Sequence, residues 1–265
     1  MLLAGIIVAG IGAALLFIRI GQVKKGSLIA GTETSKIGEL QETSKSIAQE
    51  IGAGSFNQFV ELKGSIMCET PLISELAKTP CVHYSMTVSR EWEETYWDKD
   101  SEGRSVQRTR RGSDTVASNS RSIPFEVNDG TGAIRVDPAE AEFITEKAFS
   151  QFQPGEVQGT TLRLGSLAFN IGGIALGGGR RTIGYRYEEQ IIPVNRDIYI
   201  LGEAVDSTGA LTVRKPSDKG KKFIISIKSE EALMKGINTA KILLLVFGLV
   251  FIIGGAVLLL LNFFN

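Results

Sequence analysis

Residues 242–261 read ILLLVFGLVFIIGGAVLLLL, a run of twenty residues without a charged or polar side chain. At a rise of about 1.5 Å per residue, a helix of this length spans roughly 30 Å, the thickness of the hydrocarbon core of a bilayer. Residues 2–18 (LLAGIIVAGIGAALLFI) form a second apolar run, closed by Arg19. We therefore predict transmembrane helices over 2–20 and 242–264, with the domain between them held at one membrane face.

A cleaved signal peptide is the alternative for the first run. Such a peptide has a basic segment before its apolar core and a small-x-small cleavage site after it. Here the chain begins MLLA, and RIGQ follows the run, so neither signal is found. A retained membrane helix is favoured.

Lysine and arginine residues next to the two runs predict the orientation of the chain. Basic residues gather on the cytoplasmic side of membrane helices. They occur here only on the domain side of both runs, which predicts a two-pass integral membrane protein with a cytoplasmic domain and both termini extracytoplasmic. The residues concerned are Arg19, Lys24, Lys25, Lys219, Lys221, Lys222, Lys228, Lys235 and Lys241.

The composition limits the chemistry that the domain can carry. Twenty-nine basic and 29 acidic residues give zero net charge, which argues against a general nucleic-acid binder. Cys68 and Cys81 are the two cysteines and His83 is the one histidine. This is too few for a disulfide framework or a zinc module, and we expect no metal and no cofactor. The middle of the chain is long enough for one domain or two small ones.

Residues 21–54 are predicted to contain a linker and an amphipathic helix over 32–51. Its apolar positions recur at helical spacing, at Ile37, Leu40, Ile47 and Ile51. Thr32, Thr34 or Ser35 is expected to cap its start, and Gly52 to end it. Packing on the chain's own domain is favoured over membrane-surface binding or partner capture. The acidic polar face argues specifically against binding to an anionic lipid surface.

Residues 55–229 are predicted to form a β-rich domain, followed by a linker over 230–241. Short runs of alternating apolar and polar residues indicate strands, at 59–66, 82–88, 123–127, 133–136, 181–189, 198–205, 211–214 and 223–227. Residues 128–132 (NDGTG) indicate a hairpin, and 138–152 a short helix. The predicted fold class is α+β, a small barrel or sandwich-like domain with an N-terminal amphipathic helix, flanked by two transmembrane helices.

Two segments interrupt this pattern. Residues 165–179 (GSLAFNIGGIALGGG) form an apolar, glycine-rich loop for which a structural or membrane-contact role is favoured over a ligand loop. Residues 91–121 form a polar insert, read as a long hairpin with a solvated tip. Aromatic side chains beside arginines in this insert are the alternative, a candidate partner-binding site, made of Trp92, Tyr96, Trp97, Arg108, Arg110 and Arg111.

Few residues offer covalent chemistry. In an alternating strand, Cys81 and His83 point to the same face, which makes them weak candidates for a nucleophile and its base. A structural strand histidine is favoured, because no third member of a triad is visible. Nucleophile-elbow, Walker and HExxH patterns are also missing from the sequence.

Several phrases in one order resemble a known family. They are LKG at 62–64, TPCVHY at 79–84, VNDGTG at 127–132, VDP at 136–138, TIGYRYEE at 182–189 and YILGE at 199–203. Over roughly residues 30–205, together with the helix–domain–helix layout, the chain resembles the GIDE or "beside a membrane" (BAM) domain of MULAN/MAPL-type mitochondrial ubiquitin or SUMO ligases. In those ligases a RING finger carries the activity, and a RING needs about eight Cys or His ligands. We expect that module to be absent from this chain.

Three functions remain open. The first is a membrane-anchored binding or scaffold protein with a protein partner at the bilayer surface. The second, implied by the resemblance, is a component of an E3 ubiquitin-ligase pathway. The third is a membrane hydrolase that uses Cys81 and His83. Glycines in both membrane helices also suggest packing of the helices against each other, or a homo-oligomer.

Overall fold

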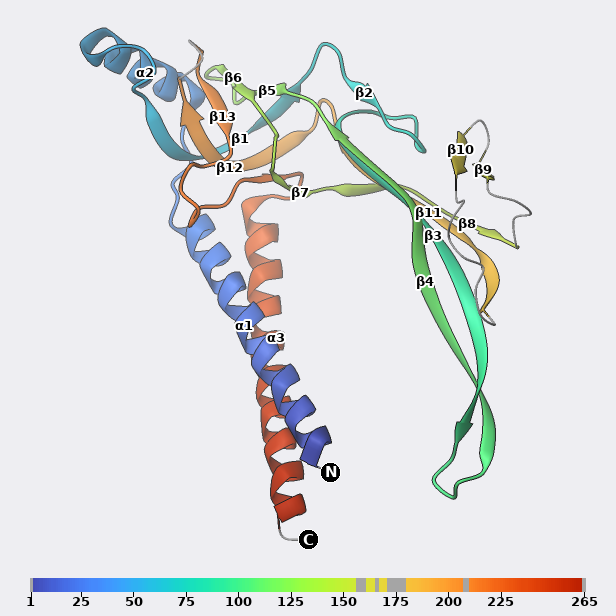
Figure 1. Cartoon of the computed structure of the whole chain (residues 1–265). Coiled ribbons are helices and arrows are strands. Elements are labelled where there is room, and N and C mark those ends of the chain that lie inside the picture. Colours follow the sequence, from blue (N-terminus) through green and yellow to red (C-terminus); the bar gives the residue numbers. More distant parts are fainter. Residues whose placement is uncertain (1, 156–160, 165–166, 171–179, 207–209, 264–265) are drawn as a thin grey trace. The chain divides into compact units, whose positions relative to one another are not determined.

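The computed structural model describes residues 2–155, 161–164, 167–170, 180–206 and 210–263 (Figure 1). The fold class is α+β, as predicted, with three helices and a β-rich remainder among these residues. The chain divides into two compact units. Unit 1 comprises Met1–Met67, Glu126–Ile144 and Asp197–Asn265, and unit 2 comprises Cys68–Phe125 and Thr145–Arg196.

The sheet of unit 1 forms a small barrel. Its strand order is β1-β5-β6-β13-β12-β14-β7, and β1 also pairs with β12, which closes five of the strands into a ring. Asp129 shapes the predicted turn between β5 and β6, because its carboxylate accepts the N–H groups of Thr131 and Gly132. The bounds are β1 Asn57–Met67, β5 Phe125–Asn128, β6 Ala133–Val136, β7 Glu142–Ile144, β12 Asp197–Val205, β13 Thr212–Arg214 and β14 Ile224–Ser226.

Two long apolar helices, α1 (Leu2–Ala30) and α3 (Glu230–Phe263), are long and apolar enough to cross a membrane. They pack against each other in antiparallel fashion through glycines. A Cβ at Gly12 would lie 2.7 Å from the Gly248 carbonyl oxygen, and one at Gly255 would lie 2.8 Å from the Gly5 oxygen. Both helices continue past their apolar runs, so the predicted linker over 230–241 is helical.

The amphipathic helix α2 spans Ile37–Ile51 and ends at Gly52, which has φ +100°. It begins five residues later than predicted, and none of the three expected caps is used. Lys36 holds the cap position without a side-chain bond, and the Ile37 N–H donates to Asp129 Oδ2 at 2.8 Å. The cap therefore comes from the β5–β6 turn, 92 residues away. Ile37 and Leu40 are buried, as their spacing predicted.

Unit 2 is built on a five-stranded sheet with the order β2-β3-β11-β8, in which β4 also pairs with β3. Strands β3 and β4 form the long hairpin predicted for the polar insert. The hydrophobic core of unit 2 joins this sheet to a separate two-stranded sheet, β9 and β10, and includes Met86, Val88, Tyr185 and Tyr187. The bounds are β2 Leu72–Ile73, β3 Pro80–Lys99, β4 Ser105–Ser122, β8 Glu146–Pro154, β9 Thr161–Leu164, β10 Leu167–Asn170 and β11 Arg180–Pro193.

The short helix predicted within 138–152 is wrong, because this segment forms β7 and most of β8. Its alanines and glutamates favour a helix in isolation, yet β8 pairs with β11 over eight positions and fits its side chains to that sheet. Of the glycine-rich segment 165–179, the structure describes only Leu167–Asn170, which form β10; the remainder lies outside the described residues.

Candidate functional site

The ends of the two long helices form part of the core of unit 1. Ile29 of α1 and Ile237 of α3 are 0% and 6% exposed, and both pack with Tyr199 of β12. Both residues lie beyond the apolar runs of their helices, and they are buried because they pack against strands of the barrel. The apolar helices and the barrel therefore share one core, which we call the helix–barrel junction.

A buried carboxylate lies at the centre of this junction. Glu61 of β1 is 1% exposed. It accepts hydrogen bonds from Tyr199 Oη at 2.8 Å and Thr34 Oγ1 at 2.6 Å. A buried charge is costly unless it is paired and hydrogen-bonded, and Lys63 Nζ completes its shell at 3.1 Å. The same ammonium group donates to Glu230 at 2.8 Å, which ties β1 to the first turn of α3.

Two protonation equilibria follow from this arrangement. Hydrogen bonding to Glu230 raises the pKa of Lys63, so its ammonium group remains charged near neutral pH. Burial, followed by the hydrogen bond to Glu61, raises the pKa of Tyr199, so its hydroxyl stays a donor. Both shifts support an anchoring role for the network, because neither group is prepared to exchange a proton near pH 7.

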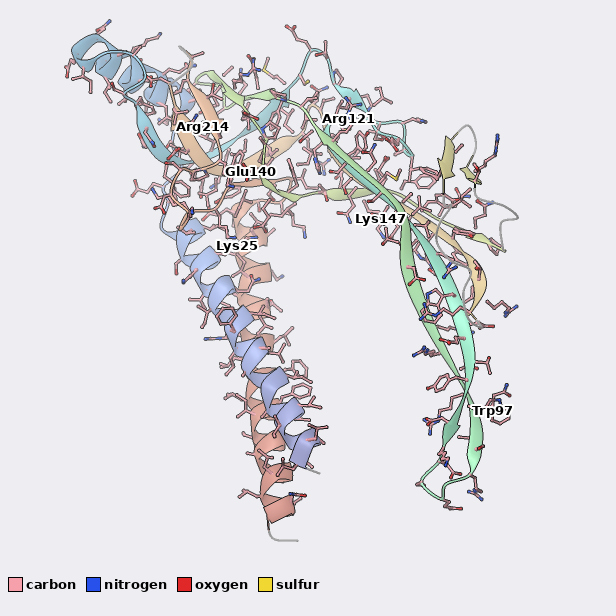
Figure 2. The ribbon with its side chains drawn as sticks, viewed as in Figure 1. Lys25, Trp97, Arg121, Glu140, Lys147 and Arg214 are labelled. Carbon is pink, nitrogen blue, oxygen red and sulfur yellow. The ribbon has the colours of Figure 1, made fainter. Side chains whose placement is uncertain are left out.

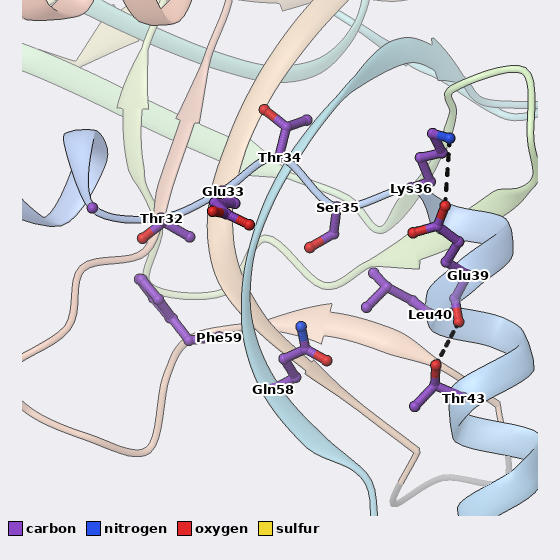
Figure 3. Close-up of a pocket in the computed structure, with 11 residues that line it drawn as sticks. Thr32, Glu33, Thr34, Ser35, Lys36, Glu39, Leu40, Thr43, Gln58 and Phe59 are labelled. Carbon is purple, nitrogen blue, oxygen red and sulfur yellow. Dashed lines mark hydrogen bonds and ion pairs between the residues drawn. The ribbon is translucent and has the colours of Figure 1, made fainter.

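Two pockets open beside the junction. One, of about 510 Å³, lies between the α1–α2 linker, β1 and α2 and is lined mainly by polar side chains (Figure 3). The dashed contacts in Figure 3 join Lys36 to Glu39 at 3.4 Å, and Thr43 to the Glu39 carbonyl oxygen at 2.8 Å. The other, of about 430 Å³, lies at the start of α3, beside Lys63 and Glu230. Neither pocket is lined by a cysteine or histidine.

Cys81 and His83 lie in the first part of β3, and both are buried. Burial raises the pKa of the Cys81 thiol to about 11 and lowers that of the His83 imidazole to about 4. Near pH 7 both groups are therefore neutral, whereas a nucleophilic cysteine needs a thiolate. The expectation that the two share a face also fails, since the pairing of β3 with β11 shifts register here and Cys81 packs with Tyr84 and Ile191.

Among the residues that the structure describes, no group of three or more histidine, cysteine, aspartate or glutamate side chains is arranged to hold a metal ion.

The predicted partner-binding residues lie along the β3–β4 hairpin. The three arginines of this set are not free, because each pairs with a β3 carboxylate across the strands. Trp97 is the aromatic member most open to solvent, with 71% of its surface exposed (Figure 2). The pairs are Arg108 with Asp98 at 3.2 Å, Arg110 with Glu94 at 2.7 Å and Arg111 with Glu93 at 3.5 Å.

The two other aromatic residues of this set contact arginines. The guanidinium carbon of Arg110 lies 5.5 Å from the ring centre of Tyr96, and that of Arg180 lies 4.1 Å from the ring centre of Trp92. Trp92 is 8% exposed. Trp97 is therefore the one aromatic side chain of the set that is both largely exposed and outside such a contact.

Comparison with known proteins identifies relatives of this sequence. Residues 93–260 match the GIDE family, which is described as E3 ubiquitin ligase. The E3 ubiquitin-protein ligase SPL1 of Arabidopsis thaliana is 25% identical over 121 residues, which cover 43% of this chain and 32% of that protein. The match thus spans about a third of the length of the relative. No solved structure matches the chain.

Proposed function

The chain belongs to the GIDE family, and we propose that it is a membrane-anchored binding or scaffold protein that presents its domain to a protein partner at the bilayer surface. The helix–barrel junction is the observation that carries this proposal. Flexible linkers between anchors and domain would let the domain move freely above the bilayer. Helices whose ends pack in one core with β12 and β14 of the barrel fix unit 1 to the anchors instead.

Trp97 is the residue that we assign to partner binding. Large exposed aromatic side chains are enriched at the energetic centres of protein interfaces. The neighbouring arginines are balanced by carboxylates, so the hairpin offers an aromatic contact with little net charge around it. This favours a protein partner over an anionic polymer.

The second candidate is a role in an E3 ubiquitin-ligase pathway, which the family match favours. The 265 residues contain two cysteines and one histidine, fewer than the roughly eight zinc ligands of a RING. A RING would therefore lie outside these 265 residues. In this version of the proposal, the partner at the bilayer surface carries the zinc-binding or conjugating module.

Purification of the tagged full chain from its own membranes in mild detergent tests both candidates. The scaffold proposal expects a stoichiometric partner that is weakened by Trp97→Ala and retained by Lys99→Ala, an exposed change on the same hairpin. Recovery of the chain alone, with or without crosslinking, would contradict the proposal.

The pathway proposal adds a second readout. The isolated chain should bind well below one zinc per chain and give no autoubiquitination with supplied activating and conjugating enzymes. The complex with its partner should transfer ubiquitin. Robust transfer by the isolated chain that Cys81→Ala abolishes would refute this assignment and return the cysteine to consideration as a nucleophile.

A further inference from the structure

One face of the unit 2 sheet brings three buried polar side chains together. Arg90 and Trp92 are two residues apart on β3 and are 4% and 8% exposed. Thr182 of β11 lies directly opposite Trp92 and is 6% exposed. On the other side of β3, Asp114 of β4 lies directly opposite Arg90. The four residues come from three adjacent strands, and we call them the Arg90 cluster.

The hydrogen bonds of the Arg90 cluster are incomplete. Arg90 Nη2 donates to Asp114 Oδ2 at 3.0 Å. Arg90 Nε, Arg90 Nη1 and Thr182 Oγ1 are buried and have no hydrogen-bond partner in the described part of the chain. Buried polar groups of folded proteins are nearly always paired. Guanidinium nitrogens donate and never accept, so the missing partner is an acceptor.

The charges around the cluster are also unbalanced. Arg180 lies over the Trp92 ring, and its contacts to carboxylates are long, 3.5 Å to Glu94 and 3.9 Å to Asp114. Glu94 is already engaged by Arg110 at 2.7 Å. Three guanidinium groups, those of Arg90, Arg110 and Arg180, therefore share the carboxylates of Glu94 and Asp114. This leaves one positive charge without a matching carboxylate.

Trp92 is held firmly in place beside these groups. A Cβ at Gly112 would lie 2.3 Å from the Trp92 ring, so the indole crosses β4 where only glycine fits. The edge of the cluster is more open, since the side chains of Arg180 and Asp114 are 36% and 37% exposed. A ligand can therefore reach the buried donors from the Arg180 side, by rotation of that flexible side chain.

We propose that the Arg90 cluster, together with the adjacent Arg180, binds an oxyanion, the phosphate or carboxylate group of a ligand, through Arg90, Arg180 and Thr182. An oxyanion supplies acceptor oxygen atoms for the unpaired donors. It also supplies a negative charge that balances the extra positive charge. Planar guanidinium groups bind two oxygens of such a group at once. The site is independent of the surface that we assign to Trp97.

Trp92 reports binding directly. The chain has two tryptophans, so Trp97→Phe leaves Trp92 as the single emitter in the full chain in detergent. We expect a saturable change in its fluorescence when inorganic phosphate replaces chloride at constant ionic strength. Acetate, titrated in the same way, separates a carboxylate site from a phosphate site.

Variants in this background assign the effect. Arg90→Met should abolish the change, and Thr182→Val, which is nearly isosteric, should weaken binding about threefold to tenfold through one lost hydrogen bond. Arg111→Met is the matched control, because its guanidinium is exposed and pairs with Glu93. If Arg90→Met does not fold, Arg180→Met and Thr182→Val carry the test. The proposal would be overturned if the Trp92 fluorescence changed linearly with anion concentration, or by the same amount in phosphate, acetate and chloride. It would also be overturned if the folded variants at Arg90, Arg180 and Thr182 kept the response of the parent.

Discussion

Gly12→Leu should separate the two long apolar helices, whereas Gly10→Leu, two residues away in the same helix, should not. A Cβ at Gly12 would lie 2.7 Å from the Gly248 carbonyl oxygen and 2.8 Å from the Ile252 nitrogen. Ordinary contacts between heavy atoms lie at about 3.5–4.0 Å, so the helices must move apart by about 1 Å for the Cβ alone. Gly10 meets nothing within 4 Å and is the matched control.

The cost of this overlap is estimated from overpacked protein cores, where extra methylenes cost about 1–3 kcal/mol. That range corresponds to a change of about 5- to 160-fold in the equilibrium between packed and separated helices. We therefore expect a measurable population of separated helices in Gly12→Leu, while the barrel of unit 1 remains folded. Gly254→Leu should behave like Gly10→Leu, because Gly254 also faces away from the partner helix.

Spin labels on Leu3→Cys and Leu260→Cys, both exposed on their helices, measure the separation by pulsed electron resonance. Cys68→Ser removes the half-buried native thiol, and buried Cys81 stays unlabelled. The parent and Gly10→Leu should each give one narrow distance, and Gly12→Leu a broader, longer one. An unchanged distance in Gly12→Leu, or equal broadening in Gly10→Leu, would show that glycine packing does not hold the helices together.

Three further predictions concern buried groups. Tyr199→Phe removes a hydrogen bond to the Glu61 carboxylate and should lower the free energy of unfolding by about 1.5–3 kcal/mol, whereas Tyr96→Phe should change it by less than about 0.5 kcal/mol; urea titration compares them. Cys81 should resist alkylation at pH 7.5, because burial raises its thiol pKa to about 11, and rapid labelling seen by mass spectrometry would contradict this. His83 has a pKa lowered by burial from 6.5 to about 4. The unfolded chain therefore binds the extra proton, and stability should fall as pH drops from about 6.5 towards 4; His83→Phe should flatten that slope, and an unchanged slope would argue against a neutral buried imidazole.

Much of the architecture can be predicted from local patterns in the sequence. The apolar runs predict both long helices, and the NDGTG turn predicts the β5–β6 hairpin, because these signals depend on neighbouring residues alone. The opposite faces of Glu188 and Glu189 also follow from strand alternation. Glu188 pairs with Lys147 at 2.7 Å, while Glu189 accepts the backbone N–H groups of Glu75, Leu76 and Ala77.

The features that escape prediction depend on distant partners. The start of α2 is set by Asp129, and the strand character of 146–154 is set by pairing with β11. Glu61 could have been singled out as an acidic residue between apolar Val60 and Leu62, yet its partner Tyr199 is 138 positions away. For the hairpin, the sequence identifies the aromatic and arginine residues, but only the β3–β4 register shows that carboxylates neutralise the arginines.

We propose, as the central claim, that a folded domain is held at the cytoplasmic face of a membrane by both of its ends. Cysteine labelling with an impermeant maleimide, in cells that express the full chain with Cys68→Ser, tests it most directly. Lys219→Cys, on an exposed loop of unit 1, should label only after permeabilisation, whereas Asn262→Cys, at the far end of α3, should label in intact cells. Ready labelling of Lys219→Cys in intact cells would contradict the claim.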